Sequence, residues 1–227
     1  KALMKQLEQQ KKFESTLSAD WKHIYDLSED IDDNLSILTV RPKQFAEQLA
    51  LYEFQLYSQI RSSELVGQQW GSNNKKRNMT AGNVVAYTDH YNQMTNWCIY
   101  QILNLPSAID RGKAIEQLIH IMVLSFHINN FLATFEIFFA LNSAPIYRLC
   151  ESWKRVPVFH IRVFWLFSHL SRQHFKLYRN ELEFIEPPGI PYIGTFLTDL
   201  TYMEDGNATR TKTGEINFHF KCAKVHQ

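Results

Sequence analysis

Apolar side chains recur every three or four positions over long stretches of this 227-residue chain. The clearest run comprises Val84, Tyr87, Tyr91, Met94, Cys98 and Ile102. This spacing places the side chains on one face of an α-helix. Only 8 Gly and 7 Pro interrupt the chain, below average shares of about 7% and 5%. Because no sustained period-two alternation bounded by hairpin turns occurs, the sequence predicts an all-α fold.

The same periodicity predicts the other helices of the chain. They cover residues 42–60, 107–122, 131–141, 158–170 and 174–185. Pro42 suits a first helical turn, and Asn83 and Ser107 are predicted N-caps. The polar segment 71–82 is rich in helix breakers and predicts a surface loop. The uncharged stretch 117–135 contains two histidines and an Asn-Asn pair, so we expect it to be buried in protein rather than to cross a membrane.

Charge and cysteine content exclude several classes of function. The chain has 24 Lys+Arg and 23 Asp+Glu, a formal charge of +1, which predicts no nucleic-acid partner. Cys98, Cys150 and Cys222 are odd in number and far apart, so they predict neither a disulfide framework nor a zinc knuckle. A reducing compartment is the simpler expectation.

Motifs for covalent chemistry are absent from the sequence. There is no GxxxxGK[ST], GxGxxG, HExxH or GxSxG pattern. His120 and His127 share a helix face but lack a third ligand, so we predict no metal site. Glu204 and Asp205 are adjacent carboxylates with no evident opposing carboxylate. On these residues alone, a helical protein-binding module is favoured over a hydrolase, without a cofactor.

The segment 189–200, which reads GIPYIGTFLTDL, resembles a known signature. In the catalytic domain of Ras-family guanine-nucleotide exchange factors (the RasGEF domain), an Ile-Pro-aromatic-x-Gly element leads into Leu-Thr-Asp-Leu. Further segments match in the family's order: 45–49, 63–67 with Trp70, 92–97, 129–131, 140–143, 147–149 with Trp153, and 215–218. The likeness covers about residues 41 to 221.

The resemblance implies a single irregular helical domain with a protruding helical hairpin. The outgoing arm of this hairpin covers about residues 191–207, and the returning arm begins at Ile216. Family members insert this hairpin between the switch regions of a Ras-like GTPase. The implied function is therefore promotion of GDP release, without covalent catalysis, cofactor or metal. The implied partner is a Ras, Rap or Ral type GTPase. The implied location is cytoplasmic, at membranes reached indirectly through the lipidated GTPase.

The family's functional positions map onto this sequence residue by residue. Thr201 and Asp205, four apart on one helix face, occupy the positions that disturb the metal and phosphate sites of the GTPase. The family's other contacts with the GTPase map onto Asn142, Tyr147, His174, Phe175, Tyr192 and Thr198. Thr201 stands where some members carry a larger apolar side chain, and Asp205 replaces the Glu of many members. Asp89 does not reproduce a basic residue that some members place nearby.

Each mapped position also has a purely structural interpretation. Asp205 is then a surface acid at a helix end, and Asn142 a plain helix cap. Tyr147 and Phe175 are then core aromatics, while Tyr192 and Thr198 pack at the base of the hairpin. These alternatives stay open at the level of sequence.

The domain organisation follows from the extent of the resemblance. We expect residues 1–40 to be a linker-like helical segment and 41–227 the RasGEF catalytic domain, lacking its last C-terminal helices. One alternative function is a GTPase-binding scaffold of the same fold with weak or no exchange activity. A helical adaptor unrelated to GTPases is a third. The residues favour no particular GTPase of the subfamily.

Overall fold

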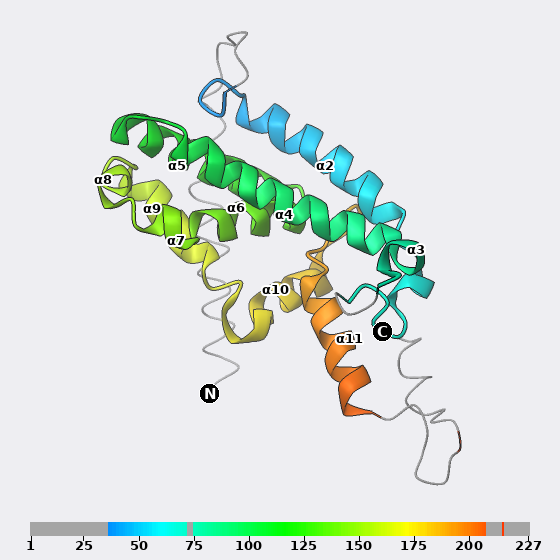
Figure 1. Cartoon of the computed structure of the whole chain (residues 1–227). Coiled ribbons are helices and arrows are strands. Elements are labelled where there is room, and N and C mark those ends of the chain that lie inside the picture. Colours follow the sequence, from blue (N-terminus) through cyan, green and yellow to red (C-terminus); the bar gives the residue numbers. More distant parts are fainter. Residues whose placement is uncertain (1–35, 72–74, 208–214, 216–227) are drawn as a thin grey trace, which may run out of the picture. The chain divides into compact units, whose positions relative to one another are not determined.

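The computed structural model describes residues 36–71, 75–207 and 215 (Figure 1). These residues form ten α-helices and one 3-10 helix, and their only β-pairing is an isolated parallel bridge between Asn130 and Ile190. The prediction of an all-α fold is therefore confirmed. The chain divides into two compact units: residues up to Gln55 with Asp89–Pro191, and Leu56–Thr88 with the residues from Tyr192 onward.

Helix labels follow Figure 1. The first unit contains most of α2 (Pro42–Ser58) and α4 (Gly82–Leu103), and all of α5 (Ala108–His127), α6 (Phe131–Leu141), α7 (Ala144–Tyr147), α8 (Cys150–Trp153), α9 (Val158–Phe167) and α10 (Arg172–Phe184). The second unit contains the end of α2, η1 (Ser62–Leu65), α3 (Arg77–Thr80), the start of α4, and α11 (Gly194–Gly206).

Helix α5 is the centre of the first unit and packs against α6, α8 and α9. Its predicted N-cap is confirmed, because the Ser107 hydroxyl accepts hydrogen bonds from the backbone of Ile109 (3.0 Å) and Asp110 (3.4 Å). Its large apolar residues Ile115, Leu118, Ile119, Ile121 and Met122 are fully buried, each contributing about 1.5–3 kcal/mol. A Cβ at Gly112 would lie 2.8 Å from Cβ of Arg155, so only glycine permits this close approach.

Helix α6 spans the predicted residues 131–141 and is buried on nearly every side. Its N-cap is Asn130, whose side-chain oxygen accepts a hydrogen bond from Ala133 N at 3.2 Å. The uncharged stretch 117–135 is consequently two helices, because the chain turns at Asn129 with φ +58°. Among the described residues, no helix is long and apolar enough to span a bilayer.

The remaining helices differ from prediction in their details. Segment 71–82 is not entirely loop, because it includes α3. Helix α10 is assigned to Arg172–Phe184, but residues 173–175 are left-handed, so its regular part starts after Phe175 rather than at residue 174. In the predicted helix 42–60, Phe45, Leu49, Tyr52, Leu56 and Ile60 recur at helical spacing, which predicts that they share the buried face. In α2, however, Tyr52 is 52% exposed, whereas its neighbour Glu53 is 0% exposed. Ile37 is also buried, in the chain ahead of α2.

The outgoing arm of the predicted hairpin is α11, which begins at Gly194 rather than at Pro191. The start is delayed because Ile190 is held extended: its backbone bonds to Phe131 N and Asn129 O, both at 2.9 Å. The helix ends at Gly206, as its sequence predicts. The predicted turn and returning arm lie outside the described residues, as does most of segment 1–40.

Candidate functional site

The mapped residues fall into two groups, one in each unit. The first unit holds Asn142, Tyr147, His174 and Phe175, and the second holds Tyr192, Thr198, Thr201 and Asp205.

Asn142 and Tyr147 lie at a corner between two helices. Asn142 is the C-cap of α6 and is exposed, with its backbone N–H bonded to the Phe138 carbonyl at 3.0 Å. Tyr147 ends α7 and is 60% exposed, so it is not a core aromatic. The indole of Trp153 donates to the Ile146 carbonyl at 3.0 Å and so fixes the short helix α7. The corner therefore presents two polar side chains to solvent on a rigid backbone.

His174 and Phe175 lie in a left-handed turn inside α10. Gln173, His174 and Phe175 have φ values of +52°, +55° and +62°, which are uncommon for residues other than glycine. The ring of Phe175 packs on Phe135, with ring centroids 5.4 Å apart. His174 is exposed. The turn therefore packs the Phe175 ring against the first unit and leaves the His174 imidazole exposed.

In the second unit, Thr198, Thr201 and Asp205 follow one another at helical spacing along α11. The hydroxyl of Thr198 donates to the Gly194 carbonyl at 2.7 Å. The hydroxyl of Thr201 likewise donates to the Leu197 carbonyl at 2.8 Å. Both hydroxyls are thus satisfied within the helix, and Asp205 is exposed near its end.

Tyr192 lies at the base of α11 and is half-buried. A Cβ at Gly194 would lie only 2.5 Å from atoms of the tyrosine side chain, so the ring covers that glycine. The Tyr192 carbonyl accepts a hydrogen bond from the Thr195 hydroxyl at 3.4 Å. Tyr192 therefore packs at the start of the helix.

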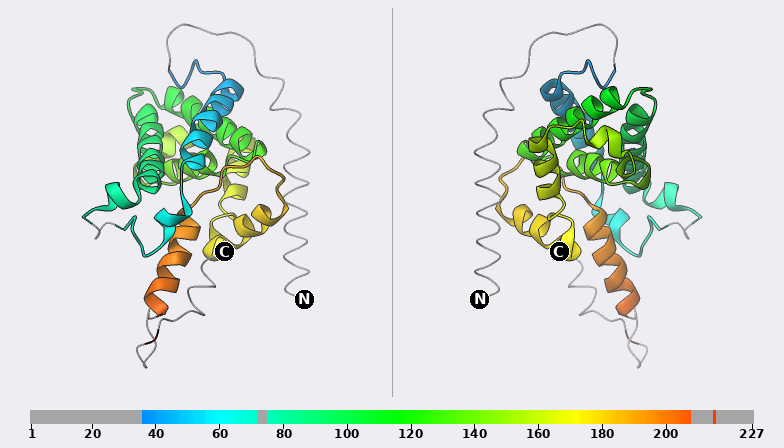
Figure 2. Two further views of the ribbon diagram at one scale, coloured as in Figure 1. Left: turned by 90° about the vertical axis from the view of Figure 1, so that its right-hand side faces the viewer. Right: turned by 90° about the vertical axis from the view of Figure 1, so that its left-hand side faces the viewer.

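The chain after η1 contacts the last turns of α11 within the second unit. The side-chain nitrogen of Gln68 lies 2.9 Å from Oδ1 of Asp205 and 3.3 Å from the Thr201 carbonyl. The backbone N–H of Gly67 donates to Oε1 of Glu204 at 3.0 Å. In both views of Figure 2, this part of the chain (cyan) passes beside α11 (orange). No local pattern of residues predicts this contact, because 133 to 137 residues separate the partners.

Glu64, also in the second unit, caps α4. Its carboxylate accepts hydrogen bonds from the backbone of Asn83 (2.9 Å), the side chain of Asn83 (2.7 Å) and the backbone of Val84 (3.2 Å). A fourth bond comes from the backbone of Arg61 at 3.4 Å. The predicted N-cap, Asn83, is thus wrong, because a carboxylate from the preceding turn satisfies the first N–H groups of the helix instead. Burial opposes ionisation, but these hydrogen bonds outweigh it and lower the pKa of Glu64.

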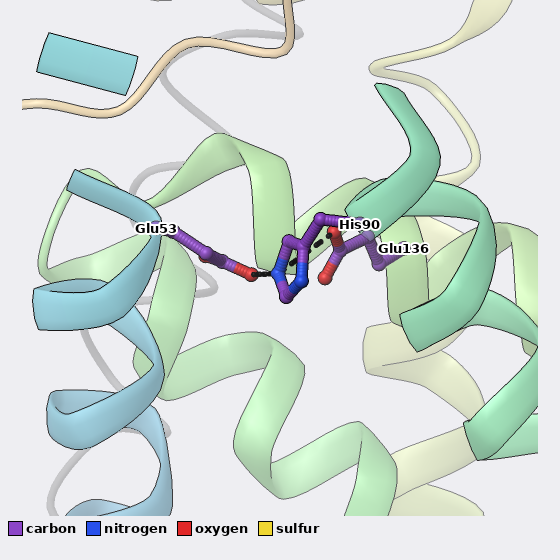
Figure 3. Close-up of side chains that lie close together, drawn as sticks. All are labelled: Glu53, His90 and Glu136. Carbon is purple, nitrogen blue, oxygen red and sulfur yellow. Dashed lines mark hydrogen bonds and ion pairs between the residues drawn. The ribbon is translucent and has the colours of Figure 1, made fainter. Parts of the chain in front are cut away.

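Three titratable side chains from three helices meet in the first unit (Figure 3). Glu53 comes from α2, His90 from α4 and Glu136 from α6. Nε2 of His90 lies 3.0 Å from Oε1 of Glu53 and 3.8 Å from Oε1 of Glu136. The other oxygen of Glu53 accepts a 2.6 Å hydrogen bond from Nδ2 of Asn130.

Glu136 is 0% exposed and receives no hydrogen bond from the described residues on either carboxylate oxygen. Burial and the nearby charge of Glu53 raise the pKa of Glu136 well above its usual 4.5. The three side chains offer ligand atoms within 4.8 Å of one another, a spacing compatible with a divalent ion. The raised pKa of Glu136 instead favours a protonated carboxyl group at this position, because burial and the charge of Glu53 oppose its ionisation.

The sequence contained one signal for this cluster. Glu136 is the only charged residue in the apolar run 131–141, and a charge on such a helix must find a partner in the interior. Glu53 had no such signal because its neighbours on α2 are mixed in character. His90 gave none either, since its partners come from other helices.

Comparison with known proteins identifies the family. The family model for the RasGEF domain matches residues 44–222. Ras guanine nucleotide exchange factor E of Dictyostelium discoideum is 37% identical over 169 residues, which are 73% of this chain and 16% of that protein.

Two animal proteins are similar over comparable lengths. Protein son of sevenless of Drosophila melanogaster is 30% identical over 86% of this chain and 12% of its own length. Ras-specific guanine nucleotide-releasing factor 2 of Mus musculus is 31% identical over 79% of this chain and 15% of its own length. The chain thus spans less than a fifth of each of these relatives. With most of its length matched and an all-α fold, the chain belongs to the RasGEF domain family.

Proposed function

We propose that this chain is a guanine-nucleotide exchange factor for a small GTPase of the Ras subfamily. The observation that carries the proposal is the family match over 44–222, which includes α11 and its exposed polar positions. The names of its relatives describe Ras exchange or nucleotide-releasing factors. In this proposal α11 is the outgoing arm of a hairpin that enters between the two switch regions of the GTPase.

The reaction is release of bound GDP, and its energetics follow from linkage. A factor that binds the nucleotide-free GTPase more tightly than the loaded form must weaken nucleotide binding by the same ratio. Each tenfold weakening requires about 1.4 kcal/mol of differential binding. Several tenfold steps require a broad interface, on the order of 2,000 Å². No covalent bond is made or broken, so the protein needs no nucleophile and no cofactor.

Thr201 and Asp205 are the proposed groups that weaken nucleotide binding. The magnesium ion and the phosphates hold the switch regions of such GTPases. A carboxylate brought to this site competes with phosphate for the positive charge. We propose that Asp205, exposed at the end of α11, supplies it. Thr201, one turn earlier, obstructs the metal site.

Nucleotide release measures the proposed activity. Ras, Rap and Ral proteins are loaded with a fluorescent nucleotide, excess GDP is added, and the decay is followed with and without the chain. We expect faster decay with at least one GTPase, and about tenfold slower catalysed decay for Asp205→Ala and Thr201→Glu. Gln48→Ala, an exposed change on α2, is the matched control. If none of the three GTPases binds or responds, the proposal is wrong.

One observation favours the alternative, a GTPase-binding scaffold without exchange activity. The hydroxyl of Thr201 already donates its hydrogen bond to the Leu197 carbonyl within α11. A scaffold would bind the nucleotide-free GTPase tightly and leave the decay unchanged. The two functions therefore separate in the same assay.

Magnesium provides a second readout of the role of Thr201 and Asp205. Added Mg²⁺ should slow spontaneous release from the GTPase more than it slows the catalysed reaction, because the factor already displaces the ion. Equal slowing of both reactions would count against action at the metal site. The membrane connection in this proposal is indirect, through the lipid anchor of the GTPase.

A further inference from the structure

The contact between the chain after η1 and α11 reaches the turn of the helix that carries the proposed exchange groups. Gln68 bonds to the side chain of Asp205 and to the backbone of Thr201, and Gly67 bonds to Glu204. Three hydrogen bonds therefore converge on five consecutive residues of α11, 201–205. None of them comes from a residue near α11 in sequence.

The backbone conformation that makes this contact is unusual. Gly67 and Gln68 have φ values of +71° and +52°, two successive residues in the left-handed region. Such a conformation is readily adopted by glycine but costs a residue like glutamine of order 1 kcal/mol or more. The turn is closed by a hydrogen bond from Gly71 N to the Gln68 carbonyl at 2.9 Å. The result is that the Gly67 N–H and the Gln68 carboxamide are both directed at α11.

The chemistry of the contact suits a fixed carboxylate. A side-chain amide is a neutral donor, so it orients a carboxylate without neutralising it. Gln68 bonds to Oδ1 of Asp205, and Oδ2 accepts no hydrogen bond from the described residues. Gln68 therefore restrains the position of the Asp205 carboxylate through one of its two oxygens.

We propose that Gln68 is a positioning residue for nucleotide exchange, holding the Asp205 carboxylate and the last turns of α11 in the arrangement that acts on the GTPase. This inference rests on the proposed function. Gly67 supports it by supplying the left-handed backbone and the bond to Glu204. Gln68 acts through Asp205, so its contribution disappears when Asp205 is absent.

A double-mutant cycle in the full chain tests the role. Gln68→Ala should lower kcat for nucleotide exchange about fivefold and leave KM for the GTPase nearly unchanged. In the Asp205→Ala background the same change should have no further effect, because coupled residues are not additive. Gln48→Ala, outside the contact, should match the wild type in both backgrounds.

Gly67 offers a test of the backbone conformation alone. No atom lies within 4 Å of a Cβ built at Gly67, so a substitution there adds strain without a clash. Gly67→Ala should slow exchange, whereas Gly67→Asn should retain more activity because asparagine tolerates the left-handed region better. Amide hydrogen exchange at 203–206 should be about fivefold faster in Gln68→Ala than in the wild type.

The outcomes separate this role from the proposed function. The positioning role alone is overturned if the wild type is active and Gln68→Ala leaves its activity unchanged. It is also overturned if Gln68→Ala lowers the activity equally with and without Asp205. A wild type that binds and accelerates none of the GTPases overturns the proposed function and this role with it. A rise in KM without a change in kcat also contradicts the inference, because it marks Gln68 as a simple contact with the GTPase.

Discussion

Glu64 and Glu136 are both buried carboxyl groups, one in each compact unit, and they differ in the donors around them. Glu64 is 5% exposed and accepts four hydrogen bonds, three from the start of α4 and one from the backbone of Arg61. Glu136 is 0% exposed, and none of the described residues donates a hydrogen bond to its carboxylate oxygens. The same side chain is therefore stabilised in opposite charge states.

The pKa values follow from these surroundings. Backbone and side-chain donors at the N-terminus of α4 favour the ionised form of Glu64 against the effect of burial, and its pKa is lowered. Burial and the neighbouring Glu53 favour the protonated form of Glu136, and its pKa is raised. Burial alone thus does not determine the charge of an acid, because the available donors decide whether its desolvation is compensated.

Helix α4 takes part in both arrangements. Its first N–H groups bond to Glu64, and His90 in its first half contacts Glu53 and lies near Glu136. One carboxylate thus fixes where α4 begins. The other acids connect α4 to α2 and α6.

The largest expected effect comes from removing the cap. Glu64→Ala leaves the buried N–H of Val84 and the amides of Asn83 without an acceptor, and each such group costs about 1–3 kcal/mol. We expect a loss of about 3 kcal/mol in the free energy of unfolding, measured by chemical denaturation. Glu47→Ala, at an exposed position on α2, should change it by less than about 0.5 kcal/mol. A loss below about 1 kcal/mol for Glu64→Ala would show that water replaces the carboxylate.

A smaller effect is expected at Glu136, where the amide resembles the protonated acid. Glu136→Gln should cost less than about 1 kcal/mol, because no charge is needed there. Glu136→Ala leaves a cavity and should cost about 2 kcal/mol. Both values come from the same denaturation experiment.

A bound divalent ion would remove this difference between the two substitutions of Glu136. Glu136→Gln would then cost as much as Glu136→Ala, and a chelator would destabilise the wild type. Such a result would mean that the cluster of Glu53, His90 and Glu136 holds a metal rather than a protonated Glu136.

The local pattern of residues was sufficient to predict some elements. The continuous apolar run gave α6 its observed bounds, and Ser107 caps α5 as its position predicts. Both features depend on neighbours within a few positions in sequence. Helix α11 was found through the resemblance, but its start was misplaced because Ile190 pairs with the chain ahead of α6.

The features that sequence did not predict depend on distant partners. The cap of α4 is Glu64, nineteen residues before Asn83, so the local preference for asparagine was misleading. On α2 the apolar pattern favoured Tyr52 as a buried residue, whereas Glu53 is buried because α4 and α6 supply its partners. The left-handed turn at 173–175 has neither glycine nor proline to mark it. Gln68 was missed because its contact with α11 joins residues far apart in sequence.

The smallest expected effect is the pH dependence of stability, which should separate the two acids. Glu64 has a lowered pKa, so its stabilising contribution is present above its usual 4.5 and is lost as the pH falls through the lower folded value. Glu136 has a raised pKa, so its own stabilising contribution is fully present below 4.5 and is lost as the pH rises through the higher folded value. The groups facing Glu136 are Glu53 from α2, and His90 and Cys98 from α4.

These two pH windows lie on opposite sides of 4.5, so matched variants resolve them. Unfolding measured from acid to neutral pH should show that Glu64→Gln reduces the loss of stability on the acid side only. Glu136→Gln should reduce only the loss of stability that occurs as the pH rises above 4.5, because an amide does not titrate. If both variants alter the same side of the profile, the two carboxyl groups do not carry opposite charge states. The contrast in donors would then not explain the behaviour of these two buried acids.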